Sequence, residues 1–155
     1  MRRSDREITD EKRIDTFIRK EHIIRVAFYD DGDIYIVPVN YGYAKEEGKH
    51  VFYFHGAKAG RKYDLAMGKP KVGFEIDGSY ELITGEMACD HSATFQSVIG
   101  TGRLSVLSEM EEKQKGLGVI MKQVTGTEVW KYDEGLLQAV AVFKLEVEKL
   151  SCKAK

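Results

Sequence analysis

Cysteine is scarce in this chain. Its only cysteines among 155 residues, Cys89 and Cys152, lie far apart and outside any Cys-x-x-Cys pair. We therefore predict no disulfide framework and expect a reduced, cytoplasmic setting. Long hydrophobic runs are also missing, and no stretch approaches the roughly 20 apolar residues that span a bilayer. The charged first residues have no apolar segment behind them, which is unlike a secretory signal.

A strong net charge is missing as well. The chain has 24 basic and 25 acidic residues, which gives a formal net charge of −1. Without an overall basic field, we expect no nucleic-acid partner. Cys89 and His91 would share one face of a strand, but no third ligand has matching spacing, so we predict no metal site.

The composition suits one folded domain over residues 1–155, with 43% hydrophobic and 32% charged residues. Runs rich in β-branched and aromatic residues, joined by polar turns, indicate strands. We predict them at 23–29, 34–43, 51–55, 72–76, 80–90, 95–107 and 140–148, with a turn at 77–79. Pro38 cannot donate to a strand ladder, so its strand is expected at a sheet edge or bulge.

Helices are predicted at three places. Asp10 can cap a short helix in which Ile14, Phe17 and Ile18 share one face. A second helix should begin near Gly60 and end before Pro70, and a third should span 109–124. Many short strands with few helices between them favour an antiparallel barrel or sandwich.

The stretch at 52–65 reads as a strand that turns through Gly56 and Gly60 into the second helix. Three cations stand at this turn: Lys58, Arg61 and Lys62. Cations at a helix start oppose the helix dipole unless an anion joins them, so we predict a phosphate-binding corner. The strand-helix-strand crossovers that Rossmann and P-loop folds require are not indicated around it.

Five pieces of the sequence, in this order, carry a resemblance to a known family. They are Met-Arg-Arg-x-Asp-Arg-Glu-Ile (1–8), Tyr35-Ile-Val-Pro-Val-Asn-Tyr-Gly-Tyr43, Phe52-Tyr-Phe-His-Gly-Ala-Lys-x-Gly60, Ser97-Val-Ile-Gly-x-Gly102 and the closing strand from Phe143. The chain resembles the flavin-binding split-barrel superfamily, the pyridoxamine 5′-phosphate oxidase-like proteins. Within it, the sequence is most similar to the NimA-like group of 5-nitroimidazole resistance proteins.

The resemblance implies a mainly β fold, a six-stranded antiparallel split β-barrel with peripheral helices. It also implies a homodimer with FMN at the subunit interface and a small aromatic substrate beside the flavin. The residues it assigns to FMN are Val37, Pro38, Val39, Asn40, Tyr41, His55, Gly56, Ala57, Lys58, Arg61, Lys62, Ser97 and Val98. Members of the group often carry a basic residue where Gln96 stands, which leaves open whether this face adds charge to the site.

His55 lies inside the motif next to the expected flavin, and an imidazole titrates near working pH, so we expect it to donate a proton. The implied function is that of an FMN-dependent oxidoreductase, with nitroaromatic or nitroimidazole reduction as the NimA-like activity. Two alternatives stay open. One is a non-catalytic split barrel that binds flavin or haem, and the other is oxidation of pyridoxamine 5′-phosphate itself.

Overall fold

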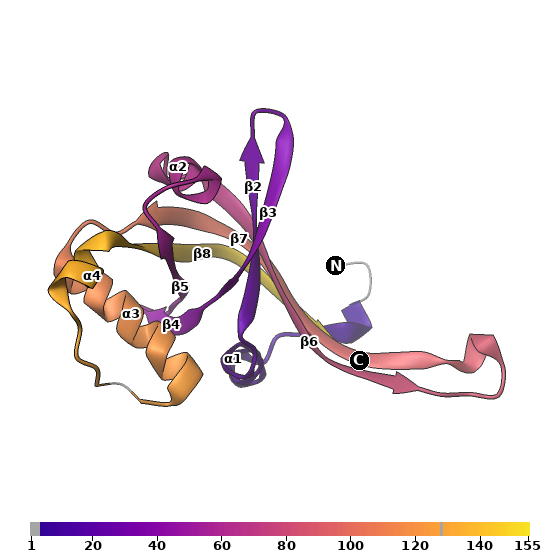
Figure 1. The fold of residues 1–155 in the computed structure, drawn as a ribbon. Helices are drawn as coiled ribbons and strands as arrows, with labels where there is room; N and C mark the ends of the chain where they lie inside the picture. Colours follow the sequence, from indigo (N-terminus) through magenta and orange to yellow (C-terminus); the bar gives the residue numbers. More distant parts are fainter. Residues whose placement is uncertain (1–3, 128) are drawn as a thin grey trace.

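The computed structural model describes residues 4–127 and 129–155, so the first three residues of the opening motif lie outside it. Figure 1 shows the arrangement of the elements. The strands are β1 (Glu7–Ile8), β2 (Ile23–Asp30), β3 (Asp33–Asn40), β4 (Gly42–Glu46), β5 (Lys49–Ala57), β6 (Lys71–Ile83), β7 (Ser92–Val106) and β8 (Val140–Ala154). The helices are η1 (Ser4–Arg6), α1 (Glu11–Lys20), α2 (Arg61–Met67), η2 (Ala88–Asp90), α3 (Met110–Thr125) and α4 (Glu134–Ala139).

All the strands belong to one antiparallel sheet with the order β3-β2-β6-β7-β8-β5-β4, and β1 pairs with β8. This confirms the predicted mainly β, antiparallel class. Pro38 lies in β3, which is a terminal strand of this order, so the predicted edge position is also confirmed.

The sheet has eight strands rather than the six that the resemblance implied. One difference is the run at 34–43, which divides into β3 and β4. Gly42 begins β4 directly under α3, where a Cβ would come within 2.4 Å of the Ile120 backbone nitrogen. The chain therefore changes its pairing partner from β2 to β5 around Tyr41, and a single straight strand cannot do this.

The predicted turn at 77–79 is wrong. The structure runs β6 through this segment as one strand, with a register shift between Gly78 and Glu81. The partner strand explains the difference, because Asp77 and Gly78 pair with β7 before the bulge and the pairing resumes beyond it. Polar residues with glycine indicate a turn locally, but they also suit a bulge in a long hairpin.

The main core is enclosed by the curled sheet, with α1 packed against it. Ile14, Phe17 and Ile18 of α1 are all buried in this core, as predicted. The Asp10 carboxylate accepts hydrogen bonds from the Lys12 and Arg13 backbone amides at 2.8 and 3.2 Å, which confirms the predicted N-cap.

A second, smaller core lies between α3 and the strands β4 and β5. The predicted helix at 109–124 is present despite two glycines. Gly116 is needed there, because a Cβ at this position would come within 2.9 Å of the Tyr53 ring. Within the described ranges, no helix combines the length and hydrophobicity needed to cross a bilayer.

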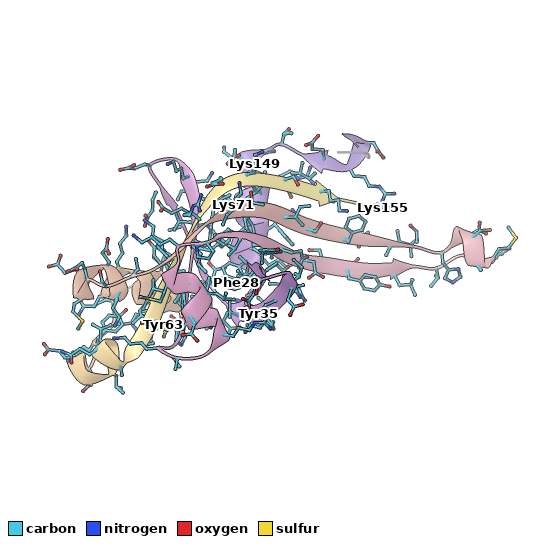
Figure 2. The ribbon with its side chains drawn as sticks, turned by 90° about the horizontal axis from the view of Figure 1, so that it is seen from above. Phe28, Tyr35, Tyr63, Lys71, Lys149 and Lys155 are labelled. Atoms are coloured by element: carbon cyan, nitrogen blue, oxygen red, sulfur yellow. The ribbon has the colours of Figure 1, made fainter. Side chains whose placement is uncertain are left out.

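The hairpin of β6 and β7 extends well beyond the rest of the sheet (Figures 1 and 2). Residues 79–94, called the arm below, pair only within this hairpin. Large apolar side chains on the arm are exposed: Tyr80, Leu82, Ile83 and Met87. Lys155 donates to Ser92 and Ser79 lies beside α1, but the apolar side chains of the arm are exposed and therefore available to a partner.

Candidate functional site

The corner predicted at 52–65 forms where β5 ends and α2 begins. Gly56 and Ala57 still pair with β8, the chain bends, and α2 starts at Arg61. Gly60 has φ = +90°, a left-handed conformation that strongly favours glycine. The sequence therefore fixes a sharp strand-to-helix turn, and its residues 57–60 are exposed.

Lys62 is the cation that this corner encloses most. Its Nζ lies 5.7 Å from the Phe54 ring centroid and 5.1 Å from that of Phe143. A Cβ on Gly56 would come within 2.9 Å of the same Nζ, so the glycine leaves room for the ammonium group. Desolvation lowers the pKa of Lys62. Among the described residues, no carboxylate pairs with this cation, so a bound anion would stabilise it.

Arg61 is held differently. Its Nε donates to Asp30 Oδ2 at 2.7 Å, and its guanidinium lies 4.8 Å from the Tyr35 ring centroid. These contacts tie α2 to the β2–β3 hairpin and bring the corner beside β3. Sequence reasoning missed both partners, because their pairing depends on the fold. A phosphate at Arg61 would share the guanidinium with Asp30.

Lys58 is exposed on the bend before α2. A fourth cation lies in the same neighbourhood: Lys113 of α3, only 2% exposed, donates to the Leu137 carbonyl. Desolvation, and secondarily the charge of Lys58, lower the pKa of Lys113. Sequence reasoning missed Lys113, because its contact joins α3 to a residue 24 positions away in the chain.

His55 lies near the end of β5, opposite Val142 of β8, with an exposed side chain. Strand alternation places it with Val51 and Tyr53 on the side that α3 covers, whereas Phe54 faces the main core. Desolvation, and secondarily the nearby Lys62, lower the pKa of His55. The ring therefore favours its neutral form, which can both accept and donate a hydrogen bond.

The predicted β3 residues form one free sheet edge. Val37 and Val39 point toward the core, while Pro38 and Asn40 are exposed. Within residues 4–127 and 129–155, β3 pairs with β2 alone, so backbone groups on its other edge have no ladder partner there. Tyr41 differs, because its ring is fully buried and its hydroxyl donates to the Ile18 carbonyl of α1.

Ser97 and Val98 are not brought to the corner within one chain. They lie on β7, three strand positions from β3, or about 14 Å at normal strand spacing. Val98 is fully buried in the core. Ser97 is on the opposite face of the sheet, in a pocket of about 270 Å³ that is also lined by Glu7, Ile99, Ser151 and Lys153.

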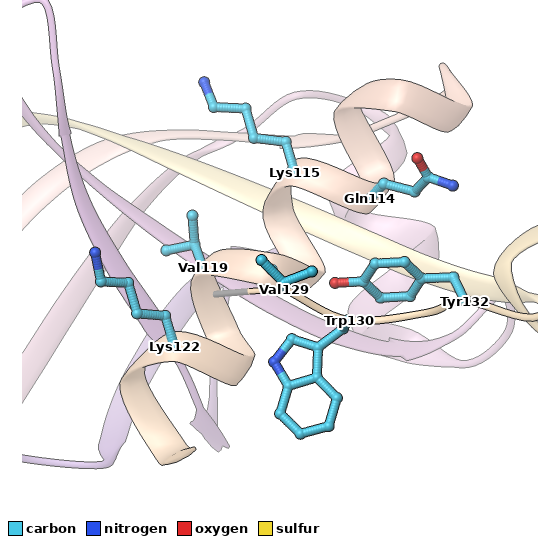
Figure 3. A pocket seen from close by; sticks show the side chains of 8 residues that line it. Gln114, Lys115, Val119, Lys122, Val129, Trp130 and Tyr132 are labelled. Atoms are coloured by element: carbon cyan, nitrogen blue, oxygen red, sulfur yellow. The ribbon is translucent and has the colours of Figure 1, made fainter. Parts of the chain in front are cut away.

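A larger groove of about 490 Å³ lies elsewhere, between α3 and residues 129–132. Figure 3 shows Trp130 and Tyr132 extending from this segment beside the helix. The Trp130 indole nitrogen donates to the Thr127 carbonyl at 2.9 Å. None of the residues predicted to bind FMN lines this groove. Among the described residues, no group of three potential metal ligands is found either.

Comparison with known families decides what kind of protein carries this corner. The model of the pyridoxamine 5′-phosphate oxidase family matches residues 10–154. The chain belongs to the pyridoxamine 5′-phosphate oxidase family. No protein of curated function matches its sequence at a significant level.

Solved structures similar to this oxidase-family chain include flavin and haem proteins. A protein assigned to 5-nitroimidazole antibiotic resistance, from Bacteroides thetaiotaomicron, shares 26% identity with a TM-score of 0.82, over 96% of this chain and 86% of that one. The flavocytochrome Anf3 from Azotobacter vinelandii shares 20% identity with a TM-score of 0.81, over 100% and 72% of the two chains. An FAD- and haem-binding protein from Mycobacterium smegmatis shares 16% identity with a TM-score of 0.81, over 96% and 72%. The last two likenesses establish the split-barrel fold alone.

Proposed function

We propose that this member of the pyridoxamine 5′-phosphate oxidase family is an FMN-dependent oxidoreductase that reduces small flat aromatic compounds, nitroaromatics among them. The observation that carries the proposal is Lys62, an enclosed cation at a sharp, glycine-shaped corner, for which the described residues provide no carboxylate partner. The likeness to the nitroimidazole-resistance protein supports the substrate class.

The donor set at the corner fits the 5′-phosphate of FMN. Lys62 and Lys58 supply positive charge, and Arg61 supplies a planar guanidinium that already binds an oxygen anion, that of Asp30. Gly56 keeps the space beside Lys62 open. The unpaired edge of β3 at 37–40 would offer backbone groups to the ring system, and Arg61 holds this edge next to the corner.

A bound flavin would accept electrons from a donor and pass them to the substrate. The chain's own residues bind and orient it, and the buried rings behind Lys62 keep water from that side of the phosphate. A neutral His55 can take up a proton and deliver it to a reduced substrate, the role expected from its position in the motif.

We also propose a homodimer. Ser97 lies on the opposite face from the core and about three strands from β3, which supports a site that Ser97 completes from a second chain. The same outward face carries exposed apolar side chains: Tyr29, Ile34, Ile36 and Ile99. Covering this surface and the arm would favour association.

The visible spectrum of the purified protein tests the flavin, and an anaerobic assay tests the reaction. We expect a yellow protein whose flavin absorbance bleaches with a reduced nicotinamide or dithionite and returns on addition of a nitroimidazole. A colourless protein that takes up no added FMN would overturn the proposal. Bleaching without reoxidation by any nitroaromatic would restrict it to flavin binding.

The two alternatives give different signals in the same experiment. A Soret band on haem titration, with no flavin retained, would identify a haem module instead, the cofactor class named for two of the fold neighbours. Aldehyde formed from pyridoxamine 5′-phosphate would identify the oxidase activity for which the family is named.

A further inference from the structure

The charges on α1 are sorted around the helix. Glu11 and Asp15 face β4, where Glu11 accepts from Lys45 at 2.8 Å and Asp15 from Tyr43 at 2.7 Å. At about 100° per residue, Lys12, Arg13, Thr16 and Lys20 fall within a separate arc of about 100°. The cations of this arc therefore point in a different direction from Glu11 and Asp15.

This basic arc forms one wall of a groove. The groove measures about 310 Å³, near the lower end of the roughly 300–1,000 Å³ typical of small-molecule pockets. Its other wall is formed by Ser79 at the base of the arm and by Gln96 of β7, whose amide also donates to Cys152 Sγ at 3.8 Å, and the buried Phe17 forms the floor. The lining thus offers positive charges and neutral donors over an apolar floor.

The cations of the groove are not used in ion pairs by the part of the chain that the structure describes. Within the described ranges, Lys12, Arg13 and Lys20 form no ion pair, whereas Arg25, Lys45, Arg61, Lys71 and Lys144 all do. Two acids lie near the groove: Asp10, which caps α1 at the backbone of Lys12 and Arg13, and Glu21, whose carboxylate lies against Gly78. Two carboxylates against three cations leave a net charge of about +1, which a bound anion would balance.

The groove is separate from the proposed flavin site. Gln96 and Ser97 are neighbours on β7 and therefore point to opposite faces of the sheet. Gln96 faces α1, and Ser97 lies in the pocket on the other face. None of the cations at the flavin corner lines the groove.

We propose that the groove between α1 and the base of the arm is a second anion site, which binds a small soluble molecule carrying at least two negative charges on phosphate groups. Lys12 and Lys20 bind the phosphate oxygens from one wall, and Ser79 and Gln96 donate to them from the other. Arg13 adds the bidentate contact that phosphate prefers.

Inorganic pyrophosphate is the probe. It is titrated into the protein saturated with FMN, or into the protein as purified if it takes up no FMN. Binding is followed by the chemical shifts of the backbone amides. We expect saturable shifts at Thr16, Ser79 and Gln96. The double variant K12A/K20A should weaken binding by about tenfold or more, as losing two charged contacts predicts. The matched control K49A/K131A removes the same charge from exposed lysines elsewhere and should change affinity less than about twofold.

Several results would overturn the proposal. They are the absence of saturable binding, shifts confined to residues 57–62, or an equal loss in the two double variants. Binding to anionic lipid vesicles that pyrophosphate does not compete with would assign the cations to a membrane surface instead. ADP that binds while adenosine does not would support the phosphate as the recognised group. Each readout is independent of whether flavin is reduced.

Discussion

Lys62 places a positive charge over two phenylalanine rings and beside a glycine. Desolvation lowers the pKa of Lys62 and so disfavours its charged form, and a bound anion would offset this cost. The three cations and two glycines of the corner could be predicted from the sequence, because they are neighbours in the chain. The contact of Arg61 with Asp30 could not, since it joins residues 31 positions apart.

His50 is a second residue whose setting has a measurable consequence. Its Nδ1 lies 2.6 Å from the Tyr43 hydroxyl, which also donates to Asp15, so the imidazole must supply the proton of its own contact. Desolvation lowers the pKa of His50; the charge of Lys45 adds to this, while those of Glu11 and Asp15 oppose it.

This geometry predicts a pH dependence of stability. Because the folded pKa of His50 lies below its ordinary value of 6.5, the unfolded chain binds more protons once the pH falls below about 6.5, and the native state loses stability. Between pH 7.5 and pH 5.5, the urea concentration at the unfolding midpoint should fall less for the variant His50→Gln than for the native protein. An equal loss in the two proteins would contradict the assignment.

At the scale of elements, α3 holds α1 in place through one side chain. Gln123 Nε2 lies 3.0, 3.0 and 3.1 Å from the carbonyl oxygens of Ile18, Arg19 and Glu21. These carbonyls belong to the C-terminal end of α1, where intrahelical partners run out. The amide therefore caps one helix from another.

Removing this cap should destabilise the fold. We expect Gln123→Ala to lower the free energy of unfolding by about 1–3 kcal/mol, because the part-buried Glu21 carbonyl loses its partner, whereas the Ile18 carbonyl keeps the Tyr41 hydroxyl. Gln114→Ala, an exposed glutamine of the same helix, is the matched control and should change it by less than about 0.5 kcal/mol. Urea denaturation measures both, and similar values for the two variants would refute the capping role.

Local pattern predicted where most elements begin, including α1 and α3, and it predicted the edge position of β3. Several ends differ: the strand expected at 80–90 ends at Ile83, and the last strand continues to Ala154. Local pattern failed where long-range pairing decides. The run at 34–43 divides because β4 must pair with β5 under α3, and the predicted turn at 77–79 is a bulge because β7 continues alongside. The short α4 was missed, since its six residues are too few to show a helical period.

At the scale of the whole molecule, the exposed arm and the outward sheet face are the surfaces that the proposed dimer would cover. Ile36 is 58% exposed on β3, on the face away from the core. Its replacement should leave the folded chain intact and act only on association. A variant at this position therefore tests assembly without changing the stability of the folded chain.

We therefore expect Ile36→Asp to shift the protein from dimer to monomer in sedimentation at micromolar concentration, and to weaken flavin binding with it. Leu136→Asp, at a side chain 72% exposed on α4, is the control and should remain dimeric. A native protein that sediments as a monomer with flavin bound would contradict the dimer and the role of Ser97. The sequence implied assembly only through the family resemblance, because no pattern in one chain identifies which exposed apolar side chains meet a partner.

We propose that the corner at 56–62 binds the phosphate of FMN. Riboflavin lacks that phosphate, so comparing the affinities of the two flavins tests the proposal directly. Fluorescence titration should give tighter binding of FMN than of riboflavin. Lys62→Met, which keeps the packing on Phe54 and Phe143, should weaken FMN binding about tenfold or more and leave riboflavin binding unchanged. Equal affinities for the two flavins in the native protein, or no effect of Lys62→Met on FMN, would contradict the account.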